Sequence, residues 1–338
     1  MKEKQINLLS LFDGMGGAVL SANRAIEELN LPIVINNYSS SEIEKSALKV
    51  LDFHWRNHET INYSQLGDIK KISADDFDTP INLIVFGSPC LQLSTISPNR
   101  DQQLCGADSG LFYQATRIIS ELKEKFPNEK VWIIAENVSS MKNETLFQMI
   151  EELELATGEE FHSIKIDSAI HSAAHRRRVY ITNFEVGQPR TEEFNLQDIL
   201  YNGYVDREKA NVFLSSDVTL LNGLCNRYLK RNIGNVVFQD EAFSKLPKEE
   251  KCELYPSILK ESGYEGKNRH GTHEYPNGCY RLLSPEERCA AHQIPEGYLT
   301  NEDLNLSKTA VMRLVGEGFN IATTTHVFKA LINEFIKE

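Results

Sequence analysis

The chain has 338 residues, 41% of them hydrophobic and 25% charged, and its formal net charge at pH 7 is -12. This composition suits a globular protein with one large and one smaller domain, and the charge argues against a protein that coats nucleic acid indiscriminately. No run of about 18 apolar residues is present and the first residues show no signal-peptide pattern. We therefore expect no membrane span and a cytoplasmic location, or a nuclear one in a eukaryote.

An apolar strand at residues 6–12, a glycine turn and a helix at residues 18–29 begin the chain. The turn reads Phe12-Asp13-Gly14-Met15-Gly16-Gly17, and its glycines let the backbone approach a ligand closely. The spacing departs from G-x-G-x-x-G, which argues against a dinucleotide site and hence against a dehydrogenase. From these residues alone, a ligand loop and a tight turn both stay open.

Acidic residues follow the next two strands. Glu42 comes after a strand at residues 33–38, about where an acidic side chain bonds ribose hydroxyls in nucleotide-binding folds. It also fits as a charge at the N-terminus of a helix. Asp68 lies at the end of a third strand, although aspartates in turns are common.

Two buried strands end in a thiol and a carboxyl group. The strand at residues 81–86 runs into Gly87-Ser88-Pro89-Cys90, where glycine and proline force a loop, and the strand at residues 132–138 contains Glu136. If these strands are neighbours, Cys90 and Glu136 emerge at the edge where open α/β sheets bind ligands. The pair suits attack on a ring that is protonated as it is attacked. A lone cysteine after a strand also packs as a small hydrophobic residue.

Three consecutive arginines begin a later strand, after a long irregular stretch at residues 97–109. Strand alternation places Arg176 and Arg178 on one face and Arg177 on the other. Two guanidinium groups on a pocket face would bind a phosphate and a base oxygen. A surface strand with exposed arginines is the alternative. Other basic patches are Arg227 with Lys230 and Arg231, and Lys267 with Arg269 and His270.

The rhythm of strands and helices is lost at residues 186–280, which we interpret as a separate region. Beyond it, Ser284, Pro285 and Glu287 predict a helix that begins with a capping box, and we interpret them as structural. The last predicted helix runs to residue 336.

The cysteines and histidines show no metal-binding pattern. No cysteines form a C-x-x-C pair and no histidines have zinc spacing, which predicts free thiols and no metal site. The cysteines are Cys90, Cys105, Cys225, Cys252, Cys279 and Cys289.

The Pro89-Cys90 loop and Glu136-Asn137-Val138 resemble the C5-cytosine-specific DNA methyltransferases, whose nucleophile loop reads Pro-Cys and whose acidic segment reads Glu-Asn-Val. The resemblance covers residues 6–184 and 275–338 in the family's order. The forms Ser88-Pro89-Cys90 and Ser172-Ala173-Ala174-His175-Arg176 look most like those of the animal de novo enzymes. Without a regulatory extension, we expect a small stand-alone enzyme of bacterial or phage style. Residues that depart from the family pattern are Leu91, Ala174 and Gly316-Glu317-Gly318.

The resemblance implies an α/β fold, the Rossmann-like fold of S-adenosylmethionine-dependent methyltransferases, with a second, smaller target-recognition domain. Residues 1–185, completed by 305–338, would form the catalytic domain, and residues 186–304 the target-recognition region. The implied activity is transfer of a methyl group from S-adenosylmethionine to C5 of a flipped cytosine in duplex DNA, through a covalent Cys90 adduct.

The resemblance also assigns roles to residues. Catalytic roles fall to Cys90, which attacks C6, to Glu136, which supports N3, and to Arg176 and Arg178, which hold the cytosine and its backbone. The residues implied to bind S-adenosylmethionine are Phe12, Asp13, Gly14, Met15, Gly16, Glu42, Ile43, Asp68, Ile69, Pro89, Phe319 and Asn320.

The expected partner is double-stranded DNA that contains cytosine. An RNA (tRNA) cytosine-5 methyltransferase would carry the same cysteine and glutamate and is one alternative. A non-catalytic DNA-binding relative is another, although we would expect it to have lost Cys90 or Glu136. The recognised DNA sequence, the oligomeric state, a paired restriction endonuclease and the base that removes the C5 proton are left open.

Overall fold

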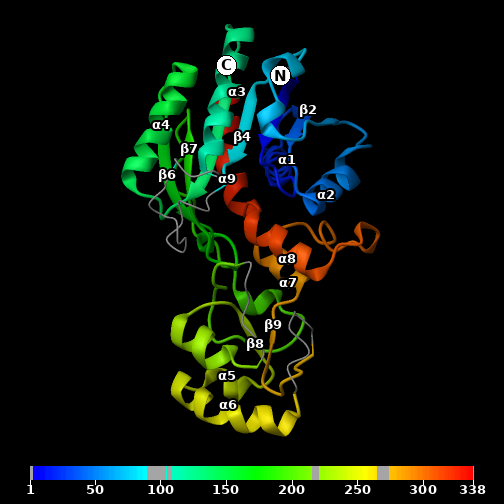
Figure 1. Ribbon diagram of the computed structural model, residues 1–338, viewed down its shortest axis with the longest axis vertical. Coiled ribbons are helices and arrows are strands. Elements are labelled where there is room, and N and C mark those ends of the chain that lie inside the picture. The colour runs from blue at the N-terminus through cyan, green and yellow to red at the C-terminus, as the bar shows by residue number, and fades with distance from the viewer. Residues whose placement is uncertain (1–2, 90–103, 105–108, 215–220, 265–273, 338) are drawn as a thin grey trace. The chain divides into compact units, whose positions relative to one another are not determined.

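The computed structural model describes residues 3–89, 104, 109–214, 221–264 and 274–337 (Figure 1). Cys90, Leu91 and most of the long irregular stretch lie outside these residues. The chain forms two compact units, each built from segments distant in sequence. The first unit comprises Met1–Asp167, Arg177–Pro189 and Thr323–Glu338, and the second comprises Ser168–Arg176 and Arg190–Ala322.

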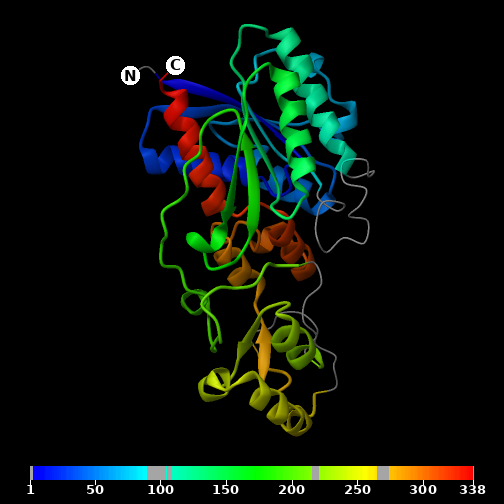
Figure 2. The same cartoon turned by 90° about the vertical axis from the view of Figure 1, so that its left-hand side faces the viewer.

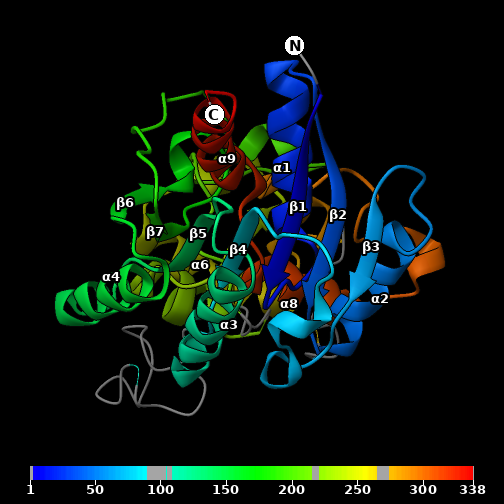
Figure 3. The same cartoon turned by 90° about the horizontal axis from the view of Figure 1, so that it is seen from above.

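A seven-stranded sheet, in the order β3-β2-β1-β4-β5-β7-β6, forms the centre of the first unit (Figure 3). β7 runs antiparallel to both its neighbours, whereas the remaining pairs are parallel. This arrangement confirms the predicted α/β class. The strands are β1 (Lys4–Leu11), β2 (Ile33–Ser41), β3 (Asn62–Gln65), β4 (Leu83–Gly87), β5 (Trp132–Val138), β6 (His162–Asp167) and β7 (Arg177–Thr182).

Helices cover both faces of this sheet, which is why its central strands are apolar on both sides. α3 (Phe112–Lys125) and α4 (Asn143–Thr157) pack on one face, where their buried residues join those of β4 and β5 in one core. α1 (Gly17–Leu29) and α9 (Ile321–Phe335) lie on the other face (Figures 2 and 3). Lys329 of α9 pairs with Glu28 of α1. α2 (Lys45–Trp55) follows β2.

The second unit contains a two-stranded antiparallel sheet of β8 (Val236–Phe238) and β9 (Tyr280–Leu282). Leu224, Tyr228 and Tyr255 pack with these strands in a small core. The helices of this unit are α5 (Glu241–Lys245), α6 (Lys248–Ser262), α7 (Pro285–Ala291) and α8 (Lys308–Glu317), with a π-helical turn at Leu224–Leu229.

α7 begins with the capping box that the sequence predicts. Ser284 is the N-cap, Pro285 occupies the first turn, and Ser284 and Glu287 exchange side-chain to backbone hydrogen bonds. The side chain of Glu287 also forms a buried ion pair with Arg281 of β9, which ties the helix to the strand. The structural interpretation of this segment is confirmed.

The return of the chain to the first unit comes later than the sequence suggested. We expected residues 305–338 to complete the first domain, but the first unit takes the chain back only at Thr323. α8 belongs to the second unit, in which the guanidinium group of Arg176 binds the carbonyl oxygens of Gly316 and Glu317 at the C-terminal end of the helix. Among the described helices, none combines the length and the hydropathy needed to cross a membrane.

Candidate active site

The glycine loop after β1 has an unusual backbone. Phe12, Gly14 and Gly16 have φ values of 54°, 59° and 82°. Glycine adopts this left-handed region freely, whereas a residue such as Phe12 is strained there. A Cβ atom added to Gly14 would meet nothing within 4 Å, so its need for glycine is conformational and the space before the loop is open. The loop thus presents main chain to an open side, as a ligand loop does.

Asp13 lies beneath this loop. Its Oδ1 accepts a hydrogen bond of 2.5 Å from the Ser10 hydroxyl, and its Oδ2 accepts one from the Tyr38 hydroxyl. Burial raises the pKa of Asp13 to about 6, against the opposing effect of these hydrogen bonds. Asp13 therefore supports the loop from the protein side, joining it to β1 and β2.

Glu42 joins the end of β2 to the glycine loop. Its Oε2 accepts a hydrogen bond of 2.7 Å from Gly14 N, and its Oε1 accepts from Ile43 N and Glu44 N at 2.7 and 2.8 Å. The apolar side chain of Ile43 is 69% exposed. The structure thus brings together the predicted cofactor residues of the first two strands.

Asp68 and Ile69 follow β3 at the same edge of the sheet. Ser41 donates a hydrogen bond of 2.8 Å to the carbonyl oxygen of Gly67, which ties this turn to β2. Asp68 caps a short 3-10 helix, Ile69–Lys71, by accepting from Lys70 N at 3.0 Å, and Ile69 is buried. The side chain of Asp68 retains a second oxygen for a ligand.

The ends of β4 and β5 are fastened to each other. Gly87 pairs with Glu136 in the parallel ladder. One step further, the amide of Asn137 donates to the carbonyl and hydroxyl oxygens of Ser88 at 3.2 and 3.1 Å. This clamp fixes the start of the Cys90 loop against the strand that carries Glu136. Sequence reasoning missed Asn137 and Ser88, although an amide directly after a strand-end glutamate was a usable signal.

Glu136 is buried, 7% exposed, and faces Arg178 across β5 and β7. Nε of Arg178 lies 2.8 Å from Oε1 of Glu136. No hydrogen bond of good geometry reaches that oxygen from any described residue, so the contact is between charges. Glu136 is therefore a buried carboxylate whose Oε1 has a charged contact but no hydrogen bond from a described residue, which is unusual.

Arg176 and Arg178 are buried and partly buried, whereas Arg177 between them is exposed, but the two guanidinium groups have different partners. β7 begins at Arg177, so Arg176 precedes the strand. Arg176 is 4% exposed and donates to the carbonyl oxygens of Gly316 and Glu317 at 2.8 and 3.1 Å. Its guanidinium group therefore caps the C-terminus of α8.

Phe319 and Asn320, the late cofactor residues predicted from the sequence, lie in the second unit. Both are buried, and the Asn320 amide donates to the Ser172 hydroxyl at 3.1 Å. Together with Arg176, Ser172 holds both ends of the segment at residues 316–320. Within the described part of the chain, no three His, Cys, Asp or Glu side chains are grouped as metal ligands would be.

The chain is similar to known methyltransferases in both sequence and fold. The family model described as C-5 cytosine-specific DNA methylase matches residues 6–333. In sequence, the chain is 29% identical over 124 residues to DNA (cytosine-5)-methyltransferase DRM2 of Oryza sativa subsp. japonica. That match covers 35% of this chain and 20% of the rice protein, so the chain spans about a fifth of this relative.

Solved structures resemble the whole chain. The methyltransferase EhMeth of Entamoeba histolytica has a TM-score of 0.70 at 15% identity, with 98% of this chain and 99% of that chain covered. A putative DNA modification methyltransferase encoded within an E. coli prophage has a TM-score of 0.58 at 18% identity, with 98% and 100% covered. At these identities the likeness concerns the fold, and it confirms the predicted Rossmann-like methyltransferase fold.

Proposed function

Because this chain belongs to the family of C-5 cytosine-specific DNA methylases, we propose that it methylates C5 of a cytosine in duplex DNA. The family carries cytosine-5 methyltransferase activity. Duplex DNA as substrate, S-adenosylmethionine as donor and a covalent route through Cys90 are our proposal. The observation that carries it is the clamp between Ser88 and Asn137, which holds the start of the Cys90 loop beside Glu136.

S-adenosylmethionine fits the residues at the ends of β1 and β2. The left-handed glycine loop faces open space, and the exposed Ile43 side chain is a surface on which an adenine ring can pack. Glu42 accepts three backbone hydrogen bonds, and a carboxylate has about four lone-pair sites, so one remains for a ribose hydroxyl. When bound, S-adenosylmethionine supplies an electrophilic methyl group.

Cys90 is the proposed nucleophile. It follows Ser88 by two residues, so covalent geometry keeps the two Cα atoms within about 7 to 8 Å of each other. Cytosine C5 is a poor nucleophile until the Cys90 sulfur bonds C6 and pushes electron density to C5. After C5 is methylated, loss of its proton and cleavage of the bond between sulfur and C6 restore the aromatic ring. The base must first leave the duplex stack, which costs a few kcal/mol.

Glu136 is proposed to contact N3 of the cytosine. Arg178 contacts only Oε1 of this buried carboxylate, and a carboxylate has about four lone-pair sites, so Glu136 keeps the capacity to accept from a protonated N3. Addition of sulfur to C6 builds negative charge on the ring, and a proton held between Glu136 and N3 stabilises it.

Arg178 and Arg176 take positioning roles in this proposal. The charge of Arg178 fixes one oxygen of Glu136. Arg176 fixes the C-terminal end of α8, and thereby the position of the segment that leads to Phe319 and Asn320. This replaces the expectation that both guanidinium groups hold the nucleotide.

The nucleophile assignment is tested by trapping. A duplex with 5-fluorocytosine carries at C5 a fluorine that cannot leave as a proton, so an adduct between Cys90 and C6 accumulates and survives denaturation. We expect a protein–DNA adduct that requires S-adenosylmethionine with the unaltered chain and with the matched control Cys252→Ser, and none with Cys90→Ser. An adduct formed by Cys90→Ser would overturn the covalent assignment.

The substrate is tested with a labelled cofactor in two arms, cytosine-containing duplex DNA and tRNA. We expect label in the DNA alone, and bisulfite sequencing of the same product would locate the methylated positions. Label confined to tRNA would contradict the DNA proposal and leave cytosine-5 methylation in place.

A further inference from the structure

A hollow of about 570 Å3 opens in the second unit beside α5 and α6. Three lysines line it, Lys245, Lys248 and Lys251, against a single acidic residue, Asp206. Leu229 and Leu246 add apolar surface. Such a gathering of positive charge stands out in a chain whose net charge is -12.

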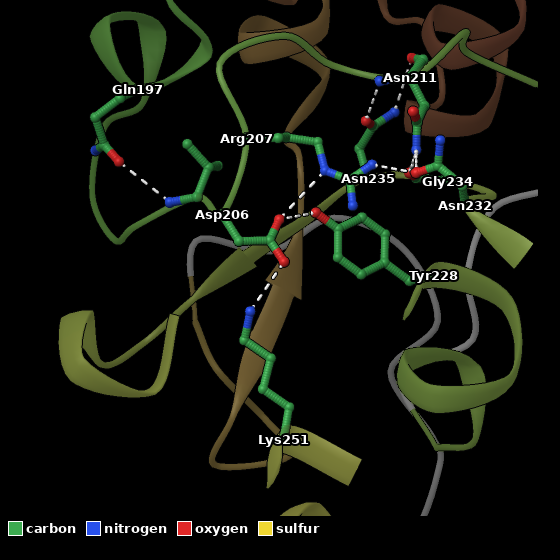
Figure 4. Close-up of polar contacts among 10 residues, drawn as sticks. Gln197, Asp206, Arg207, Asn211, Tyr228, Asn232, Gly234, Asn235 and Lys251 are labelled. Carbon is green, nitrogen blue, oxygen red and sulfur yellow. Dashed lines mark hydrogen bonds and ion pairs between the residues drawn. The ribbon is translucent and has the colours of Figure 1, made fainter. Parts of the chain in front are cut away.

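The charge of Asp206 is already compensated within the protein. Figure 4 shows its carboxylate surrounded by three groups. Lys251 Nζ donates to Oδ2 at 3.0 Å, Arg207 Nε donates to Oδ1 at 3.2 Å, and the Tyr228 hydroxyl donates to Oδ1. Two cations face one carboxylate, although only Lys251 of the two lines the hollow, so the negative charge of Asp206 is balanced within the protein.

Lys251 has unused hydrogen-bonding capacity. Lys251 is 3% exposed, and its ammonium group has three N–H donors. One donor reaches Asp206, and Nζ also lies 4.8 Å from the centre of the Phe238 ring. No second oxygen acceptor for it occurs among the residues that the structure describes. A buried ammonium group with spare donors is costly, and an anion in the hollow would satisfy it.

Lys245 and Lys248 stand at the exposed rim. Lys245 pairs with Glu241 at 2.6 Å and Lys248 with Glu249 at 3.6 Å, and all four side chains are at least half exposed. Exposed pairs of this kind contribute about 0 to 1 kcal/mol, so the lysines can exchange these glutamates for a DNA phosphate at little cost.

We propose that this hollow binds a phosphate group of the DNA backbone, with the lysines around the phosphate and the two leucines beside the sugar. The inference rests on the proposed function and names part of its DNA contact. A body with net charge -12 repels duplex DNA, so binding needs local regions of positive charge, and a concave region focuses their field. Lysines at phosphates release counterions, which makes the contact measurable through salt.

The experiment measures the Kd for a short labelled duplex at several salt concentrations between roughly 50 and 200 mM. The test variant is Lys245→Gln with Lys248→Gln, because both side chains are exposed and leave the core intact. Lys260→Gln is the control, since it removes an exposed lysine of α6 that lies about 18 Å along the helix from Lys248. We expect the double variant to bind roughly tenfold more weakly at low salt and to reduce the salt slope by about 1 per lost phosphate contact.

Three outcomes decide the proposal. A reduced slope in the double variant, with Lys260→Gln unchanged, supports it. A Kd and slope equal to those of the control overturn it, and if the protein still methylates duplex DNA the proposed function stands alone. Binding of inorganic phosphate that depends on the lysines, without any change in the DNA slope, also overturns it, because the hollow would then be a small-anion site. Failure of the unaltered protein to methylate DNA would instead count against the proposed function.

Discussion

Each unit of the molecule buries a glutamate beside an arginine, and the two pairs differ in how completely they are satisfied. In the second unit, both side chains of the Glu287–Arg281 pair are 0% exposed, and Glu287 accepts from Arg281 at both oxygens at 2.7 Å. It also accepts from Ser284 N and Tyr201 N. In the first unit, Glu136 has one charged contact, and no hydrogen bond from a described residue reaches its Oε1.

The same contrast separates the buried Asp13 from the partly buried Asp206. Burial acts to raise the pKa of Asp206, but the hydrogen bond from Tyr228 and the charges of Arg207 and Lys251 outweigh it, so the pKa lies below its usual value. Asp13 receives hydroxyl hydrogen bonds without such cations, and burial raises its pKa to about 6. Carboxylates of the second unit are completed by the protein, whereas those at the sheet edge of the first unit keep capacity for something else.

Replacing Glu136 by glutamine should give the largest effect. The substitution keeps the shape and removes the charge that supports a protonated N3, so we expect kcat to fall by about 10² to 10⁴. The Kd for duplex DNA should change little. Single-turnover methyl transfer and DNA binding, measured on the same preparation, check both. An equal loss in rate and in DNA affinity would make Glu136 a structural residue like Glu287.

The same substitution at Glu287 should give the opposite pattern. Glu287→Gln leaves the buried guanidinium group of Arg281 without its countercharge, and we expect the free energy of unfolding to fall by about 3 kcal/mol. The kcat per folded molecule should be retained. Urea titrations of both glutamine variants, with active-site counting, provide the measurement. A larger stability loss in Glu136→Gln than in Glu287→Gln would break the distinction between the two pairs.

Local sequence patterns predicted the strands that carry the site. Buried parallel strands are continuous apolar runs, so β4 and β5 and the polar residues at their ends were visible. The capping box of Ser284 and Glu287 was equally local. The resemblance gave the family and the fold, while the finer likeness to the animal de novo enzymes and the roles of the site residues stay predictions.

Contacts between distant segments were not predictable. The clamp between Asn137 and Ser88 and the facing of Glu136 and Arg178 depend on strand order and register, which no local pattern encodes. The partners of Arg176 were equally hidden, because the carbonyl oxygens that it binds lie 140 and 141 residues later in the chain. The lysines of the hollow are separated in sequence by Leu246-Pro247 and by Glu249-Glu250, so no basic run marked them, and they meet through the turn between α5 and α6.

The two aspartates supply a test in which the signs of the pH dependence differ. The pKa of Asp13 is about 6 in the folded protein against an ordinary value of 3.8, so between these pH values the folded state binds more protons than the unfolded state. Stability therefore falls as the pH rises through this window, by up to about 3 kcal/mol from this one group. Asp13→Asn removes the titration, so the stability of this variant relative to the unaltered protein should rise between about pH 4 and pH 7 in urea titrations without cofactor.

Asp206→Asn should show the reverse trend, because the lowered pKa of Asp206 stabilises the folded state above the unfolded-state pKa and this contribution is lost as the pH falls. Parallel trends in the two variants would mean that the surroundings of Asp13 compensate its charge as fully as those of Asp206.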